Sequence, residues 1–210
     1  MQMTFRQPSS TNFAASGFAV LPALYTPAEV AALLACVESA PAANPNFRRS
    51  QDVFAIRNLL GEIPALGPLL ATPALRGLLD ELFSKGCHLT KAIYLDKPAG
   101  SNWLVTWHQD LMINVAQRAD RPGYGPWTAK AGWVAVRPAE TIASHTATAT
   151  VCAVPAGGAM LMKPLLLHAS NRSTSARPRR VIHLEFSAEE LLAGLARAAG
   201  AGLAARARFN

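Results

Sequence analysis

The segment Trp107-His108-Gln109-Asp110 decides how this 210-residue chain is interpreted. On an extended segment, side chains at positions i and i+2 point to the same side, so His108 and Asp110 share a face. An imidazole and a carboxylate placed in this way suit two ligands of one metal ion. A third candidate ligand, His168, follows the apolar run Leu165-Leu166-Leu167. The sequence therefore predicts a metal site with three protein ligands.

Two histidines and one carboxylate on one face of a metal, with positions left open, form the facial triad of non-haem Fe(II) enzymes. Each residue also has a structural interpretation. His108 and Asp110 could be a surface turn pair or a helix-capping contact, and His168 could be a core histidine. Only the combination of the three favours a metal. The remaining histidines are interpreted as structural or pocket-lining residues: His88, His145 and His183.

Composition and charge limit the classes of protein to consider. Half of the residues are hydrophobic, enough for the core of a single domain. The chain has a net charge of +7, but it contains no run of five like charges and no aromatic residues interleaved with basic ones. This pattern argues against nucleic-acid binding. Three cysteines without CxxC spacing predict neither a disulfide framework nor a zinc site. Without a secretory pattern or a membrane-length apolar run, a cytoplasmic protein is expected.

Two helices with threonine caps are predicted in the N-terminal half. Thr26-Pro27-Ala28-Glu29 supplies an N-cap, a proline at the first helical position and a reciprocal glutamate, and predicts a helix to about Glu38. Thr72-Pro73 opens a second helix by the same chemistry, ending before Gly86. We expect both helices to support a sheet.

The pattern then changes to short apolar runs separated by turn residues, which is typical of strands. Strands are predicted at residues 89–95, 105–108, 133–137, 141–148, 151–154, 159–162, 165–169 and 180–186, after a first one at 17–22. Helices followed by short strands indicate an α+β fold around a barrel or jelly roll. We interpret the chain as a flexible arm and one domain: the arm at 1–15, and the domain at 16–210 with helical support at 24–86, a β core at 87–187 and a C-terminal helix at 188–199.

Several motifs, in order along residues 16–187, resemble the phytanoyl-CoA dioxygenase-like family of Fe(II)- and 2-oxoglutarate-dependent oxygenases. An HxD motif alone would be weak evidence. The HxD at His108, a distal His168 after an apolar strand and an arginine eleven positions later form a specific combination. The matching segments are Gly17–Pro22, Asp96-Lys97-Pro98, Trp107–Leu111, Gly157-Gly158, Met162–Ser170 and Arg179–Phe186.

The resemblance implies a role for each site residue. It implies that His108, Asp110 and His168 bind Fe(II), that Arg179 pairs with the far carboxylate of 2-oxoglutarate, and that Ser170 contacts the same carboxylate. A guanidinium suits this task because it can donate two parallel hydrogen bonds to a carboxylate. Arg180 is the second candidate for the arginine.

The resemblance also implies a double-stranded β-helix and an activity. The expected reaction hydroxylates an unidentified small molecule with O₂ and releases succinate and CO₂ from 2-oxoglutarate. The alternative is a catalytically inactive relative that binds a metal or a ligand without turnover. Neither interpretation predicts a nucleic-acid or membrane partner.

The chain departs from the family between Asp110 and His168. The interval is 168 − 110 = 58 positions, shorter than is usual in the family. Residues that would form a core strand near the active site are therefore missing, and a lost strand leaves backbone groups unpaired along an edge. Either the protein is a naturally shortened member, whose pocket is then more open than in longer relatives, or the natural chain has a loop here that this sequence lacks.

Overall fold

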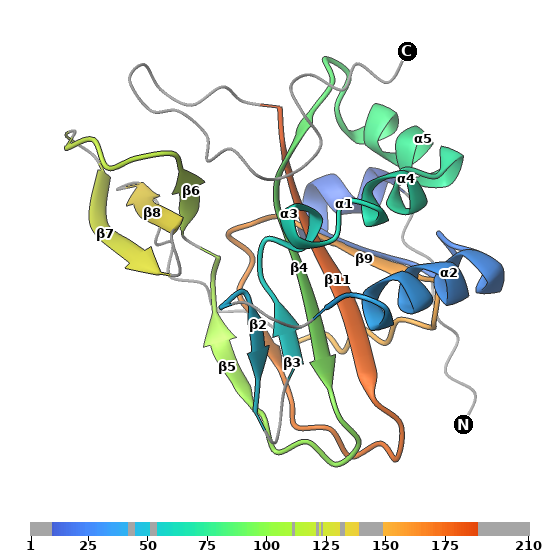
Figure 1. Ribbon diagram of the computed structural model, residues 1–210. Coiled ribbons are helices and arrows are strands. Elements are labelled where there is room, and N and C mark those ends of the chain that lie inside the picture. The colour runs from blue at the N-terminus through green and yellow to red at the C-terminus, as the bar shows by residue number, and fades with distance from the viewer. Residues whose placement is uncertain are drawn as a thin grey trace.

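The longest strands, β4 (His88–Lys97) and β11 (Arg179–Ser187), pair antiparallel at the centre of the protein (Figure 1). β3 (Phe54–Ile56) pairs with β4, and β2 (Phe47–Arg49) pairs with β3, which gives a four-stranded sheet of order β11-β4-β3-β2. The computed structural model describes residues 10–41, 45–50, 54–110, 112–120, 122, 124–130, 133–138 and 149–188.

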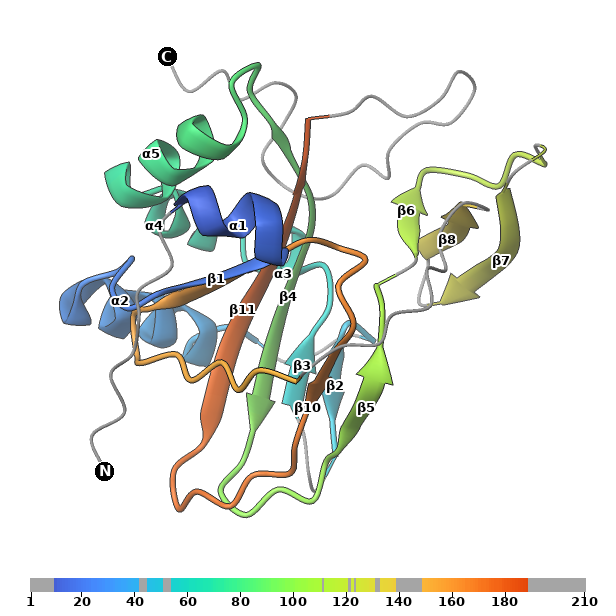
Figure 2. The same ribbon diagram turned by 180° about the vertical axis from the view of Figure 1, so that it is seen from behind.

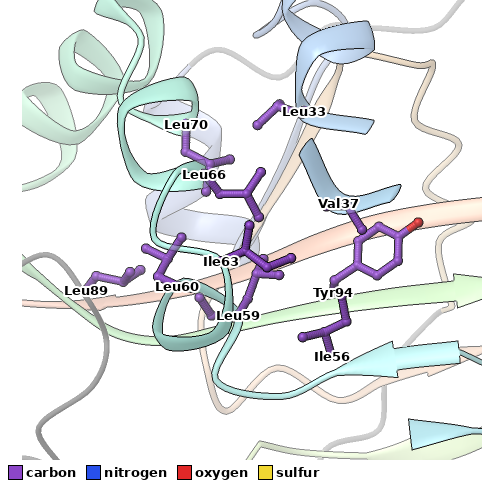
Figure 3. Close-up of a cluster of buried hydrophobic side chains, with 11 residues drawn as sticks. Leu33, Val37, Ile56, Leu59, Leu60, Ile63, Leu66, Leu70, Leu89 and Tyr94 are labelled. Atoms are coloured by element: carbon purple, nitrogen blue, oxygen red, sulfur yellow. The ribbon is translucent and has the colours of Figure 1, made fainter. Parts of the chain in front are cut away.

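Helices cover one face of this sheet. They are α2 (Pro27–Glu38), α3 (Leu59–Glu62), α4 (Leu66–Leu70) and α5 (Pro73–Leu82). A further helix, α1 (Ser10–Ser16), contacts the strand that follows it at Phe18–Leu21. Figure 3 shows the core where α2, α3 and α4 meet the sheet, with Leu59 and Leu66 fully buried. Ile182, Leu184 and Phe186 of β11 pack against the same core. Among the described residues, no helix combines the length and apolar character needed to cross a membrane.

The two predicted caps are confirmed, and they explain where α2 and α5 begin. The Thr26 hydroxyl accepts from the Glu29 N–H at 3.3 Å, and the Glu29 carboxylate accepts from the Thr26 N–H at 2.7 Å. Thr72 accepts from the Leu75 N–H at 3.2 Å. These bonds satisfy backbone donors that the first turn leaves unpaired.

The other face of the sheet carries β5 (Val105–His108) and β10 (His168–Ser170), which pair antiparallel in a two-stranded ladder (Figure 2). Side chains alternate along β4 and β11. Because Ile182 and Leu184 enter the helical core, Arg179 and His183 face the β5–β10 ladder.

Two smaller sheets complete the described structure. β1 (Phe18–Leu21) pairs with β9 (Ala159–Met162), and both strands match the sequence prediction. β6 (Ile113–Val115), β7 (Tyr124–Lys130) and β8 (Trp133–Pro138) form a three-stranded sheet of order β6-β8-β7. In Figure 1 this sheet lies beyond the end of β5, away from the helices.

The structure corrects several expectations. Residues 10–15 of the predicted arm belong to α1, which contacts β1. Residues 151–154 form no strand, and Val151 is 91 % exposed, so its β-branched side chain has no sheet surface to cover. The predicted strand at 165–169 begins only at His168. The predicted strand at 141–148 and all but the first residue of the predicted helix at 188–199 lie outside the described residues.

Candidate metal centre

The β5–β10 ladder brings the three predicted ligands together. His108 and His168 are register partners, and their ring centroids lie 4.1 Å apart. Asp110 follows the end of β5, where its N–H donates to the Pro164 carbonyl at 3.2 Å. One ligand atom from each of the three residues lies within 4.8 Å of the other two, and all three side chains are half-buried. The Nε2 of His168 lies 3.6 Å from Oδ2 of Asp110.

The outer hydrogen bonds of the two imidazoles fit a metal-binding role. His108 Nδ1 lies 2.8 Å from the Thr106 carbonyl oxygen, and His168 Nδ1 lies 2.9 Å from the Leu166 carbonyl oxygen. A carbonyl oxygen only accepts, so each Nδ1 carries the hydrogen, and a neutral ring then keeps its lone pair on Nε2. Metal-bound histidines are usually oriented by such a bond from the second ring nitrogen. Two imidazoles and one carboxylate are a donor set that suits Fe(II).

A cationic site lies beside these three residues. Arg179 Nη2 donates to Ser170 Oγ at 2.5 Å, and Lys97 Nζ donates to the same oxygen at 2.8 Å. Lys97 is only 3 % exposed and also donates to the carbonyl oxygens of Trp103 and Asn171 at 3.0 and 3.1 Å. Ser170 follows His168 by two positions, so strand β10 carries one residue of this cationic site and one of the predicted metal ligands.

The charge of this site has no partner of opposite sign in the described part of the chain. No carboxylate there lies within 4.0 Å of the Lys97 or Arg179 cation. Burial, and then the positive charge of Arg179, lower the pKa of Lys97 to about 8. Two cations and a hydroxyl without a counter-ion form a site for an anion, and a carboxylate fits it well.

Sequence reasoning did not identify Lys97 as a site residue. The signal was present, because Asp96-Lys97-Pro98 is one of the motifs on which the family resemblance is based. Its importance depends on the register of β4 and β11, which places Lys97 directly opposite Arg179. Sequence spacing alone does not give that register.

The second candidate for the arginine, Arg180, points to the other face of the sheet. It pairs there with Glu38 at 3.1 Å and with Asp96 at 3.3 Å. A cavity of about 220 Å³ lies around these charges and the ring of Tyr94. Of the two candidates, Arg179 is therefore the one on the face of the metal ligands.

A second group of potential ligands borders the first and shares Asp110 with it. One ring nitrogen of His183 and one oxygen each of Asp110 and Glu185 lie within 4.8 Å of one another. His183 Nε2 lies 3.2 Å from Glu185 Oε1, and Lys91 forms a short ion pair with the same oxygen. Burial alone would raise the pKa of Glu185, but the hydrogen bond from His183 and the charge of Lys91 outweigh it and lower that pKa. His183, predicted as structural or pocket-lining, thus lies at the edge of the metal centre.

Large apolar side chains near the metal ligands are exposed. Trp107 is 58 % exposed, because it alternates with His108 on β5 and no described strand pairs over its face. Leu104, Leu165 and Leu167 are also exposed. We call these four residues the apolar rim; the exposure of its side chains agrees with the open surroundings expected from the short interval before His168.

Comparison with solved structures identifies proteins of similar fold. HygX from Streptomyces hygroscopicus, solved with nickel and 2-oxoglutarate bound, is 14% identical, with 84% of each chain covered and a TM-score of 0.55. EvdO2 from Micromonospora carbonacea var. aurantiaca is 16% identical, with 84% of this chain and 88% of that chain covered and a TM-score of 0.54. SnoK, a non-heme alpha ketoglutarate dependent carbocyclase from nogalamycin biosynthesis, is 15% identical, with 83% and 80% covered and a TM-score of 0.53.

At these identities, the likeness concerns the fold. No family model and no curated protein matches the sequence. HygX has also been solved with iron bound, and EvdO2 in complex with 2-oxoglutarate. The cofactors that these neighbours hold agree with the prediction of Fe(II) and 2-oxoglutarate. This chain therefore has a mixed helix-and-strand fold like that of HygX, EvdO2 and SnoK.

Proposed function

We propose that this protein is an Fe(II)- and 2-oxoglutarate-dependent oxygenase of the phytanoyl-CoA dioxygenase type, with a jelly-roll core, that hydroxylates a small molecule. One observation carries the proposal: three metal-type ligands lie beside a cationic site that has no counter-ion among the described residues, on β10 and its neighbours. His108, Asp110 and His168 would hold Fe(II), and Arg179, Ser170 and Lys97 would hold the far carboxylate of 2-oxoglutarate.

The residues of the chain have separate tasks in this reaction. The carbonyl groups of Thr106 and Leu166 orient the two imidazoles, so that Nε2 of each ring is available to the metal. Arg179 and Lys97 would hold the cosubstrate by its far carboxylate, through charge-assisted hydrogen bonds. When bound, Fe(II) and 2-oxoglutarate supply the oxidising chemistry, in which O₂ is consumed and succinate and CO₂ are released.

The exposed apolar rim supports a second candidate, a relative that binds metal and cosubstrate but does not turn over. A catalytic site gains from excluding water, which strengthens the electrostatic interactions inside it. Trp107 and Leu165, which lie close in sequence to the ligands, are 58 % and 41 % exposed. An open site of this kind would bind ligands more readily than it would sustain the reaction.

Anaerobic titration tests the proposal directly. Fe(II) followed by 2-oxoglutarate should produce a weak visible charge-transfer band in the wild-type protein and none in His108→Ala. Absence of the band in the wild-type protein would refute the oxygenase assignment. After O₂ is admitted, succinate in amounts above the iron concentration supports the enzyme, and the band without succinate supports the non-catalytic relative.

A further inference from the structure

His183 lies on the metal-facing side of β11, and no step of the proposed reaction uses it. Its register partner on β4 is Ile93, and the next pair on the same face of the sheet is Lys91 with Glu185. Alternation along the strand places His183 and Glu185 on the same face as Arg179. Along β11, Arg179 of the cationic site therefore lies near one end of the strand, and His183 and Glu185 lie toward the other end, on the same face.

The ring of His183 contacts Glu185, which in turn forms an ion pair with Lys91. Its Nε2 lies 3.2 Å from Glu185 Oε1, and that oxygen also accepts from Lys91 in a short ion pair. Thr90 donates to the Glu185 carbonyl oxygen at 3.0 Å, which ties the same residue to β4. These side chains are only about a quarter to a third exposed, at 25 % for Lys91 and Glu185 and 30 % for His183. A ring held in this way keeps one orientation.

Asp110 needs a partner of this kind. A carboxylate that binds a metal through one oxygen leaves its second oxygen to be satisfied by a hydrogen bond. Among the side chains that the structure describes, no hydrogen bond to the Asp110 carboxylate is formed apart from its contact with the ligand His168. A His183 ring nitrogen lies within 4.8 Å of an Asp110 oxygen, a separation that one bridging water or a small rotation closes.

We propose that His183 is a positioning residue for Asp110, holding the second oxygen of the metal-binding carboxylate directly or through one water molecule. This inference rests on the proposed function, because it assumes that Asp110 binds a metal. Glu185 and Lys91 act one step further out, since they fix the ring of His183. The same atoms could instead hold a second metal ion, and the experiment below separates the two.

Binding of Co(II), which is followed by its visible spectrum and by calorimetry, tests the proposal without turnover. Wild type should bind one Co(II) per chain. His183→Ala should weaken Co(II) binding by about 10- to 100-fold, the range for outer partners of metal ligands. His183→Asn keeps an amide nitrogen near the position of Nδ1, and His183→Gln keeps one near the position of Nε2. One of these two variants should recover part of this loss. Glu185→Gln should give a smaller loss than His183→Ala, because the ring remains but is less firmly held.

The matched control is Ile93→Ala, which shortens the register partner of His183 on the same face without removing a polar group. It should bind Co(II) as wild type does. The thermal unfolding temperature of metal-free His183→Ala should stay close to that of wild type, so that its loss of affinity is not a loss of folding.

Three outcomes would overturn the inference in distinguishable ways. Wild-type affinity in His183→Ala, with one Co(II) per chain, removes the positioning role and leaves the proposed function intact. Two Co(II) ions per wild-type chain, with only the second lost in His183→Ala, would assign His183 to a second metal site. A wild-type protein that binds no Co(II) would refute the proposed function and this inference together.

Discussion

Lys97 and Arg179 lie directly opposite each other in the register of β4 and β11, and both side chains donate to one oxygen, Ser170 Oγ. Two cations are thereby held together without a carboxylate within 4.0 Å in the part of the chain that the structure describes. An arrangement that is unfavourable by itself becomes favourable when an anion binds, and this relationship leads to two predictions.

Replacing Arg179 with Met should weaken 2-oxoglutarate binding by about tenfold to a hundredfold. A hydrogen bond to a charged group contributes about 1.5–3 kcal/mol, and each 1.4 kcal/mol is a factor of ten in affinity. Calorimetric titration of the Co(II)-loaded protein with 2-oxoglutarate measures the change. Arg177→Met, at an exposed position two residues earlier, is the matched control and should leave the affinity unchanged. Equal losses in both variants would point to overall charge instead of a specific contact.

Replacing Lys97 with Met should weaken 2-oxoglutarate binding but stabilise the free protein near neutral pH. The pKa of Lys97 is lowered from 10.5 to about 8. Below pH 8 both folded and unfolded chains hold this proton, and the folded state bears the whole cost of the buried charge. Between pH 8 and 10.5 the unfolded chain binds more protons, so the contribution of Lys97 to the free energy of unfolding rises with pH.

Urea unfolding at several pH values checks this prediction. The difference in stability between Lys97→Met and wild type should be largest below pH 8 and should shrink toward pH 10.5. Wild-type affinity for 2-oxoglutarate should fall above pH 8, as Lys97 loses its charge. A stability difference that does not change over this range would contradict the assignment.

Removing the distal histidine should abolish metal-dependent stabilisation. A ligand that binds only the folded state raises its stability by about 2.7 kcal/mol when present at a hundred times its dissociation constant. His168→Ala should lose this increment in Co(II), because one of three metal ligands is gone. Leu167→Ala, the exposed neighbour, should keep it. Thermal unfolding with and without Co(II) measures both variants.

Truncating the core between α4 and the sheet should destabilise the whole domain. Leu66 is completely buried, so Leu66→Ala should lower the free energy of unfolding by about 2–5 kcal/mol. Urea unfolding measures the loss. In the fraction that stays folded, Co(II) affinity should be unchanged, because Leu66 lies on the helical side of the sheet (Figure 3).

Local chemistry predicted part of the fold, and pairing between distant segments decided the rest. Thr26 and Thr72 predicted the starts of their helices, because an N-cap depends only on neighbouring residues. β7 (Tyr124–Lys130) is not among the predicted strands, because glycine and proline, here Gly125 and Pro126, are typical of turns. The register of its pairing with β8 shifts across these two residues. β2 and β3 are not among the predicted strands, because each is only three residues long and β3 is held by its pairing with the distant β4.

Some residues of the candidate site could likewise be predicted from the sequence, and others depend on the pairing of distant strands. His108, Asp110 and His168 were found from motif and spacing, and the structure places them within reach of one another. Lys97 and His183 were not assigned to the site, because their proximity to it follows from the β4–β11 register. Register between strands more than eighty positions apart cannot be derived from spacing.

The β5–β10 ladder is held by its own short pairing and lies on the open side of the sheet. A two-stranded ladder is only marginally stable by itself. An ion bound by His108 and His168 would therefore act as a cross-link between segments sixty positions apart. Its arrival should slow amide hydrogen exchange along both strands, so that the order of this part of the protein depends on metal supply.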